Sequence, residues 1–224
     1  MTQSDQQFRM VRMKKLENLR ASGIDPYPHR YKRTHTSSEA RLFFEEERDR
    51  GGDDVRTSEV SVAGRIVNFR KMGNASFLDL QDGHGKIQIL LRRNNLKDTY
   101  ESIKNLDIGD WLGVQGPIFL TKTGEITIEC EQWDILAKSI LPLPEKWHGL
   151  ADVEIRYRQR YLDLIANENA RRIAILRSAV VKNLRNLMDN SGFMEVDTPV
   201  LVSVPAGGTA TPFTTYYKSL DRDL

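Results

Sequence analysis

Several side chains near the middle of the sequence are of the types that single-stranded nucleic acids require from a binding surface. An aromatic ring stacks on a base, an amide hydrogen-bonds a base edge, and a cationic group contacts a phosphate. Here the ring is Phe77, the amides are Asn74 and Gln88, and the cations are Arg65, Arg70 and Lys71. These residues support recognition of bases and phosphates. No residue of the sequence is predicted to be a catalyst or a metal ligand.

Short strands must position these side chains. Alternation of apolar and polar residues predicts five of them, with turns at Asp82-Gly83 and Thr123-Gly124. The predicted strands are Glu59–Arg70, Ala75–Asp82, Lys86–Leu91, Asp110–Leu120 and Glu125–Leu136, with a short helix at Asp98–Leu106. Five strands with a helix between the third and the fourth predict a small Greek-key barrel of the oligonucleotide-binding (OB) type.

The alternation also predicts which face of the barrel binds. Leu78 and Leu80 on the second strand should point into the core, so Phe77 should point outward. The same parity on the third strand, where Ile87 and Ile89 flank Gln88, should turn Gln88 outward. OB barrels bind on the face of these two strands. Two alternatives stay open: a shift of register by one residue would bury Phe77, and the face could bind a protein.

Helices are predicted on both sides of the barrel, at Ser4–Ser22, Ser37–Arg50 and Asn169–Ser191. The first should place Met10, Met13, Leu16 and Leu19 on one side, with a basic remainder that is either simply solvated or touches phosphates. Ser37 or Ser38 should cap the second. The third carries an apolar stripe, formed by Ile173, Leu176, Val180, Leu184 and Leu187.

Composition limits the class of protein. The chain has 224 residues and a net charge of +2, so no strong global field points to nucleic acid. No apolar run approaches the roughly 20 residues that span a bilayer, and the N-terminus lacks a signal-peptide core. The single cysteine, Cys130, lies in a predicted strand and is expected to be a small buried side chain. A cytoplasmic protein without a membrane partner is expected.

The segment Asp152–Leu164 is dense in arginine and tyrosine, which suits either a phosphate-contacting patch or a joint between domains or subunits. Together with the preceding prolines, Pro142–Leu164 resembles the hinge of bacterial-type class II lysyl-tRNA synthetases. Gly64-Arg65, Gly73–Phe77 and Lys86–Gln88 are similar to the anticodon-binding barrel of that family. Phe193–Pro199 resembles the end of its first class II motif, a helix followed by a strand that stops at a proline.

The resemblance implies an α+β fold: a five-stranded OB barrel with N-terminal helices, followed by the truncated start of an antiparallel-sheet synthetase domain. Its expected parts are N-terminal helices and a basic connector (1–58), the anticodon-binding barrel (59–138), a hinge (139–164) and the start of the catalytic domain (165–224). It implies that Phe77 stacks on an anticodon base and that Gln88 and Glu125 hydrogen-bond base edges. Arg65, Arg70 and Asn74 complete the implied RNA-binding set.

In the synthetase part, the resemblance places Gly207 against the amino-acid substrate and Pro199, Arg156 and Arg158 at a homodimer interface. A full-length enzyme of this family attaches lysine to tRNA with ATP and Mg²⁺. In the family, the ATP-binding motifs lie downstream of the position that corresponds to Leu224. We therefore expect an N-terminal portion that binds tRNA but does not aminoacylate. The alternatives are a stand-alone RNA-binding module, a related aspartyl or asparaginyl enzyme, and a structural protein that dimerises.

Overall fold

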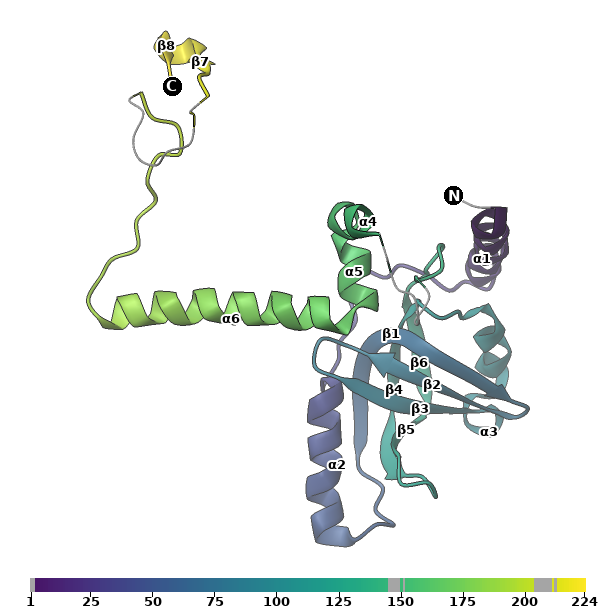
Figure 1. Ribbon diagram of the computed structural model, residues 1–224. Helices are drawn as coiled ribbons and strands as arrows, with labels where there is room; N and C mark the ends of the chain where they lie inside the picture. Colours follow the sequence, from purple (N-terminus) through teal and green to yellow (C-terminus); the bar gives the residue numbers. More distant parts are fainter. Residues whose placement is uncertain (1–2, 145–149, 151, 204–210, 212) are drawn as a thin grey trace. The chain divides into compact units, whose positions relative to one another are not determined.

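The computed structural model describes residues 3–144, 150, 152–203, 211 and 213–224. The chain divides into two compact units, Met1–Leu150 and Ala151–Leu224. The first unit contains a barrel with helices around it, and the second is mostly helical (Figure 1). The four-part division expected from the sequence stays a prediction.

The barrel closes through five strands, as predicted. They are β1 (Glu59–Met72), β2 (Ala75–Gln81), β3 (Lys86–Arg92), β4 (Trp111–Leu120) and β5 (Ile126–Cys130). Strand β1 bends at a bulge between Ile66 and Asn68, so its first half pairs with β4 and its second half with β2. The pairing then runs from β2 to β3, from β3 to β5 in parallel, and from β5 back to β4.

The single fifth strand predicted at Glu125–Leu136 is two strands in the structure. Glu131 separates β5 from β6 (Gln132–Ala137), which pairs with the first half of β4. The chain passes very close to β4 at this break, because a Cβ on Gly116 would lie 1.9 Å from the carbonyl oxygen of Glu129. Only glycine permits this approach. The sequence does carry a signal for the break, because the consecutive polar residues Glu131 and Gln132 shift the apolar alternation by one residue; the prediction of one continuous strand overlooked it.

The core parity predicted for β2 and β3 is confirmed. Leu78, Leu80, Ile87 and Ile89 are at most 1% exposed and belong to one apolar cluster inside the barrel. The connection from β3 to β4 differs from the predicted helix at Asp98–Leu106. It consists of one helical turn, α3 (Arg93–Leu96), followed by the 3₁₀ helix η1 (Lys97–Asn105). Cys130 is buried, as expected, and burial raises the pKa of its thiol.

Helix α1 (Gln3–Ala21) packs on the barrel by a face that differs from the predicted one. Leu16 and Leu19 are buried as expected, but Met10 and Met13 are exposed, and the next buried position is Arg12. The Arg12 guanidinium donates to the backbone carbonyls of Ser139, Leu141 and Ile108. Several carbonyl acceptors therefore hold a side chain that was predicted on the basic side of the helix, away from its apolar contact.

A buried charged cluster completes the attachment of α1. Lys138 is fully buried and its ammonium group lies 2.6 Å from Asp107 and 2.8 Å from Asp110. Lys15 of α1 binds the other oxygen of Asp107 at 2.5 Å. Burial alone would raise the pKa of Asp107, but hydrogen bonds and positive charge from Lys138 and Lys15 outweigh burial and lower that pKa.

Helix α2 (Ser37–Gly51) runs beside the barrel (Figure 1) and buries Ala40 and Phe44 against it. Its N-cap is Thr36 rather than Ser37 or Ser38. Thr36 and Glu39 form a reciprocal capping box. Ser37 is instead the link to the barrel, because its backbone N–H and hydroxyl both donate to Asp82 in the β2–β3 turn.

The second unit contains three α-helices among its described residues. They are α4 (Val153–Arg158), α5 (Arg160–Ala166) and α6 (Glu168–Asn190), and the last confirms the helix predicted there. A small hairpin follows, with β7 (Tyr216–Tyr217), the 3₁₀ helix η2 (Lys218–Leu220) and β8 (Arg222–Asp223). The strand expected within Phe193–Pro199 is not formed. A strand needs a partner for its backbone groups, and the part of the chain that the structure describes offers none to this segment.

Candidate nucleic-acid interface

The outer face of strands β1, β2, β3 and β5 carries the predicted site. One row of directly paired residues crosses all four strands: Arg70, Phe77, Leu90 and Glu129. Residues opposite each other in neighbouring strands share a face of the sheet. Phe77 is half-buried, and the Arg70 guanidinium lies 6.0 Å from the centre of its ring, at the limit of a cation–π contact. The row therefore offers an accessible aromatic ring beside a cation.

A second row runs next to the first and is mostly polar. It consists of Asn68, Asp79, Gln88, Thr127 and Phe119, taken in order across the sheet. The Asn68 amide donates to Asp79, and the Thr127 hydroxyl donates to the side-chain oxygen of Gln88. Thr127 is fully buried and lies opposite Gln88 on the neighbouring strand, so this hydrogen bond holds the half-buried Gln88 side chain in place. The Gln88 amide oxygen keeps a second lone pair and its NH₂ group carries two hydrogens, so the amide retains groups that can face a ligand.

Phe77 and Gln88 are diagonal neighbours on this face, because Gln88 is two residues from Leu90, the residue opposite Phe77. Such neighbours lie about 7–8 Å apart. A ring and an amide at this separation can act on the same base, one through its face and the other through its edge. The structure thus brings together Arg70, Phe77 and Gln88 from the predicted set.

The other three predicted RNA-binding residues lie at the margins. Arg65 is opposite Gln81, at the far end of β2 from Phe77. Its guanidinium packs 5.2 Å from the centre of the Trp111 ring and donates to the carbonyl of Gly109, and burial lowers its pKa. These contacts indicate a structural task for Arg65.

Asn74 is exposed in the tight turn between β1 and β2, next to Gly73, whose φ is +55°. Glu125 is exposed just before β5, and Arg41 of α2 binds its carboxylate at 3.0 Å. A base that bonds to Glu125 therefore competes with Arg41 or shares the carboxylate with it.

Sequence reasoning missed several residues of this face: Arg56, Asn68, Arg92, Phe119, Thr127 and Glu129. Glu129 is nearly buried and forms ion pairs with both Arg56 and Arg92, the latter at 3.2 Å. The Arg56 guanidinium also lies 5.7 Å from the centre of the Phe119 ring. Alternation along β5 was the signal that could have found Thr127 and Glu129. The parallel β3–β5 pairing that brings them beside Gln88 and Leu90 is not visible in sequence.

The residues predicted for the synthetase part lie in the second unit, and their roles stay predictions. Arg156 and Arg160 bind the buried carboxylate of Asp163 at 2.9 and 2.7 Å. Burial works against the ionised form of Asp163, but these cations and their hydrogen bonds lower its pKa. Arg158 pairs with Glu154 at the surface, and Pro199 is exposed. Gly207 lies outside the described residues.

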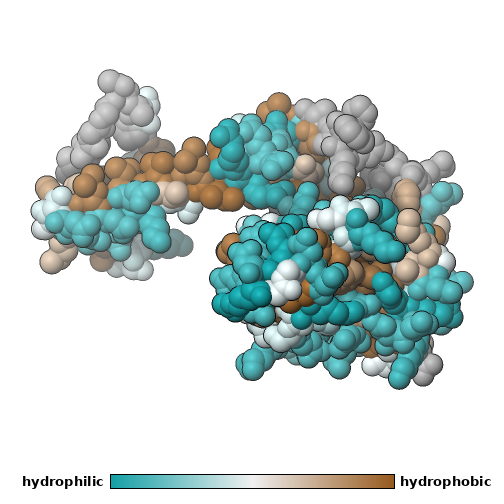
Figure 2. Space-filling view, turned by 90° about the horizontal axis from the view of Figure 1, so that it is seen from below, coloured by the Kyte–Doolittle hydropathy of each residue, from teal (hydrophilic) through white to brown (hydrophobic). Residues whose placement is uncertain are grey.

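Helix α6 exposes the apolar stripe that the sequence predicted. Figure 2 shows apolar atoms gathered along one side of this helix and polar atoms along the other. Each residue of the stripe is at least 50% exposed; they are Ile173, Leu176, Val180, Leu184 and Leu187. Exposed apolar patches of this kind mark interaction surfaces.

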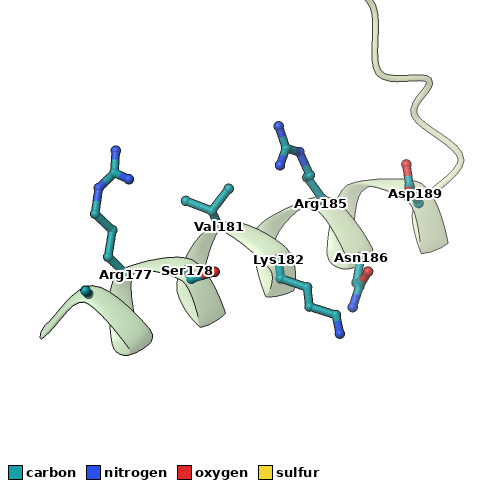
Figure 3. A pocket seen from close by; sticks show the side chains of 8 residues that line it. Arg177, Ser178, Val181, Lys182, Arg185, Asn186 and Asp189 are labelled. Atoms are coloured by element: carbon teal, nitrogen blue, oxygen red, sulfur yellow. The ribbon is translucent and has the colours of Figure 1, made fainter. Parts of the chain in front are cut away.

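A shallow hollow lies on another side of α6 (Figure 3). Its eight lining residues, which include Arg177, Lys182, Arg185 and Asp189, all belong to this one helix. The charged side chains in Figure 3 point in different directions rather than toward a common centre. One helix cannot enclose a ligand, so the hollow is not a candidate site.

Comparison with known proteins agrees with this geometry. Residues 60–136 match the family described as "OB-fold nucleic acid binding domain", and residues 152–224 match "tRNA synthetases class II (D, K and N)". The chain is 47% identical to a lysine–tRNA ligase of Pelotomaculum thermopropionicum and 48% identical to that of Carboxydothermus hydrogenoformans. Both alignments cover 96% of the present chain. The chain is a homologue of lysine–tRNA ligases.

The match does not extend over the whole of these relatives. The chain spans 41% of the Pelotomaculum lysine–tRNA ligase and 42% of the Carboxydothermus one. A lysine–tRNA ligase of Legionella pneumophila (strain Lens), 46% identical, is covered to 43%. The similarity therefore includes the barrel and part of a class II synthetase domain. Within the described residues, no helix has both the length and the apolar character needed to cross a membrane.

Proposed function

We propose that the barrel of this chain binds the anticodon loop of tRNA and that the whole protein is a lysine–tRNA ligase. The observation that carries the proposal is the outer barrel face, where Phe77 and Gln88 lie as diagonal neighbours beside Arg70. Recognition of single-stranded RNA needs this combination of a stacking ring, a base-edge donor and a cation. The lysine–tRNA ligase homologues support the choice of tRNA as the RNA.

The proposal assigns recognition to the described residues and names no catalytic residue among them. They contain no group of three or more His, Cys, Asp or Glu side chains that could hold a metal ion. ATP and Mg²⁺ are therefore proposed for the whole protein, without ligands assigned among these residues. The proposal also includes a cytoplasmic location.

A homodimer is part of the same proposal. The apolar stripe of α6 and the segment Phe193–Pro199 are exposed, and a second copy could cover both. A strand from a second copy would also satisfy the backbone groups of Phe193–Pro199, which have no strand partner among the residues that the structure describes. Arg156 is already bound to Asp163, so its part at such an interface would be to hold α4 against α5.

Binding to stem–loop RNA tests the recognition step. A fluorescent anticodon stem–loop with the lysine anticodon is compared, by anisotropy, with the same stem carrying a different loop. We expect the lysine loop to bind at least about fivefold more tightly, since an unpaired Gln88 amide costs about 1–3 kcal/mol. Equal affinity for both loops would instead indicate a general RNA-binding module.

Aminoacylation by the whole protein tests the substrate. We expect tRNA to be charged with lysine, and not with aspartate or asparagine, the other two amino acids of the matched class. Charging with aspartate or asparagine would replace lysine in the proposal without changing the role of the barrel.

A further inference from the structure

Three charged side chains from distant parts of the first unit meet at one end of the Phe77 row. Arg56 precedes β1, Arg92 ends β3 and Glu129 lies on β5. The Glu129 side chain is 6% exposed, whereas the side chains of Arg56 and Arg92 are 53% and 52% exposed. One buried carboxylate thus holds two arginines whose ends reach solvent.

The two guanidiniums have more N–H donors than the carboxylate of Glu129 can accept. A guanidinium has five N–H donors, whereas one carboxylate has two oxygens and shares them between two guanidiniums in this cluster. Its net charge is +1. A buried ion pair is weak evidence for a stabilising role, because removing a carboxylate from water costs several kcal/mol. A position that keeps two guanidiniums at the surface of a candidate RNA-binding face suits anion binding instead.

We propose that Arg56 and Arg92, positioned by Glu129, bind the sugar–phosphate backbone of the RNA strand whose base stacks on Phe77. This inference rests on the proposed function and adds a site to it. In the row, Leu90 lies between Phe77 and Glu129, and Arg70 lies on the opposite side of Phe77. Strands are about 4.8 Å apart, so the cluster begins about 10 Å from Phe77. Cations therefore flank the ring on both sides.

Glu129 is a positioning residue in this proposal. It contacts no RNA, and its carboxylate restricts the motion of two long side chains before binding. Without it, both arginines would have to be ordered when RNA binds, at a cost in affinity for each. Its negative charge, by contrast, repels RNA. These two effects change the RNA affinity in opposite directions, so the affinity of a Glu129 variant shows which of them is larger.

The salt dependence of RNA binding tests the two arginines. Each phosphate contact with single-stranded RNA contributes about 0.7 to the slope of log affinity against log salt. We expect Arg92→Gln and Arg56→Gln each to reduce the slope by about 0.7. Arg93→Gln is the matched control, because Arg93 is 51% exposed and also pairs with an acid, Glu101, but packs on Tyr100 of η1. Its slope should equal that of the unchanged chain.

Glu129→Gln tests the positioning role. This variant removes a negative charge, so simple electrostatics predicts tighter binding, whereas loss of positioning predicts binding that is roughly threefold weaker or more. Thermal unfolding curves give the folded fraction of each variant at the temperature of the binding assay, and the measured affinities are corrected for it. Tighter binding by Glu129→Gln would overturn the role of Glu129. Unchanged slopes for Arg92→Gln and Arg56→Gln would overturn the phosphate site.

The outcomes also separate this inference from the proposed function. If the unchanged chain does not bind stem–loop RNA, the proposed function fails. If it binds with loop preference, and the arginine variants keep both slope and affinity, only the additional phosphate site fails.

Discussion

Replacing Phe77 with alanine should separate a binding surface from a core position. Phe77 is half-buried on the outer face, between Arg70 and Leu90, and it is not part of the apolar cluster inside the barrel. If its ring stacks on a base, Phe77→Ala should cost about 1–3 kcal/mol of binding free energy, or about 5- to 150-fold in affinity. The free energy of unfolding should fall much less than for a buried ring.

The expected stability loss follows from the burial of the ring. A fully buried phenylalanine costs about 3–5 kcal/mol when it is truncated to alanine, and a half-buried ring outside the core should cost about 1–2 kcal/mol. Leu78→Ala is the matched control on the same strand. Leu78 is fully buried, so this change should cost about 2–5 kcal/mol of stability while the folded fraction binds RNA normally.

Two measurements decide the question. Chemical denaturation gives the free energy of unfolding, and fluorescence anisotropy with an anticodon stem–loop gives the affinity of the folded protein. The reasoning is refuted if Phe77→Ala lowers stability as much as Leu78→Ala and leaves the affinity unchanged, since Phe77 would then act as a core residue.

Three further predictions concern stability. Gly116→Ala should lower the free energy of unfolding by at least about 2 kcal/mol, because its Cβ would meet the Glu129 carbonyl at 1.9 Å. Gly83→Ala has open space around it and should be nearly neutral by denaturation; equal losses would contradict the close approach. Lys138→Met should cost about 3–5 kcal/mol by leaving two carboxylates without their buried cation, whereas the exposed Lys122→Met should change little. Asp107 has a lowered pKa when folded, so its contribution is full above its unfolded pKa of about 3.9 and is lost as pH falls through the folded value. Chemical denaturation between pH 7 and pH 3 compares the free energy of unfolding of the unchanged chain with that of Asp107→Asn. The unchanged chain should be more stable by a constant amount above about pH 5 and by a shrinking amount below about pH 4; a difference that grows in acid would contradict this assignment.

Local patterns in the sequence were sufficient for the first four strands and for the two faces of β2 and β3. Period-two alternation around Leu78, Leu80, Ile87 and Ile89 determines which side chains enter the core, because a strand with one buried face tolerates no register shift. The outward positions of Phe77 and Gln88 follow from that parity alone. The helix predictions were wrong in two details: Arg12 lies on the buried face of α1, where Met10 and Met13 were expected, and Thr36 caps α2 in place of Ser37 or Ser38.

Only the tertiary structure decided which of the candidates meet. The bulge after Ile66 and the parallel β3–β5 pairing join residues far apart in the chain, so Arg70, Phe77, Leu90 and Glu129 form one row. The same pairings leave Arg65 at the far end, against Trp111. From the sequence alone, Phe77 and Gln88 were predicted to bind a base, but the cations that lie beside them were not determined. The fold provides Arg70 on one side and the Glu129-held arginines on the other, because strand pairing is a long-range property that local alternation does not encode.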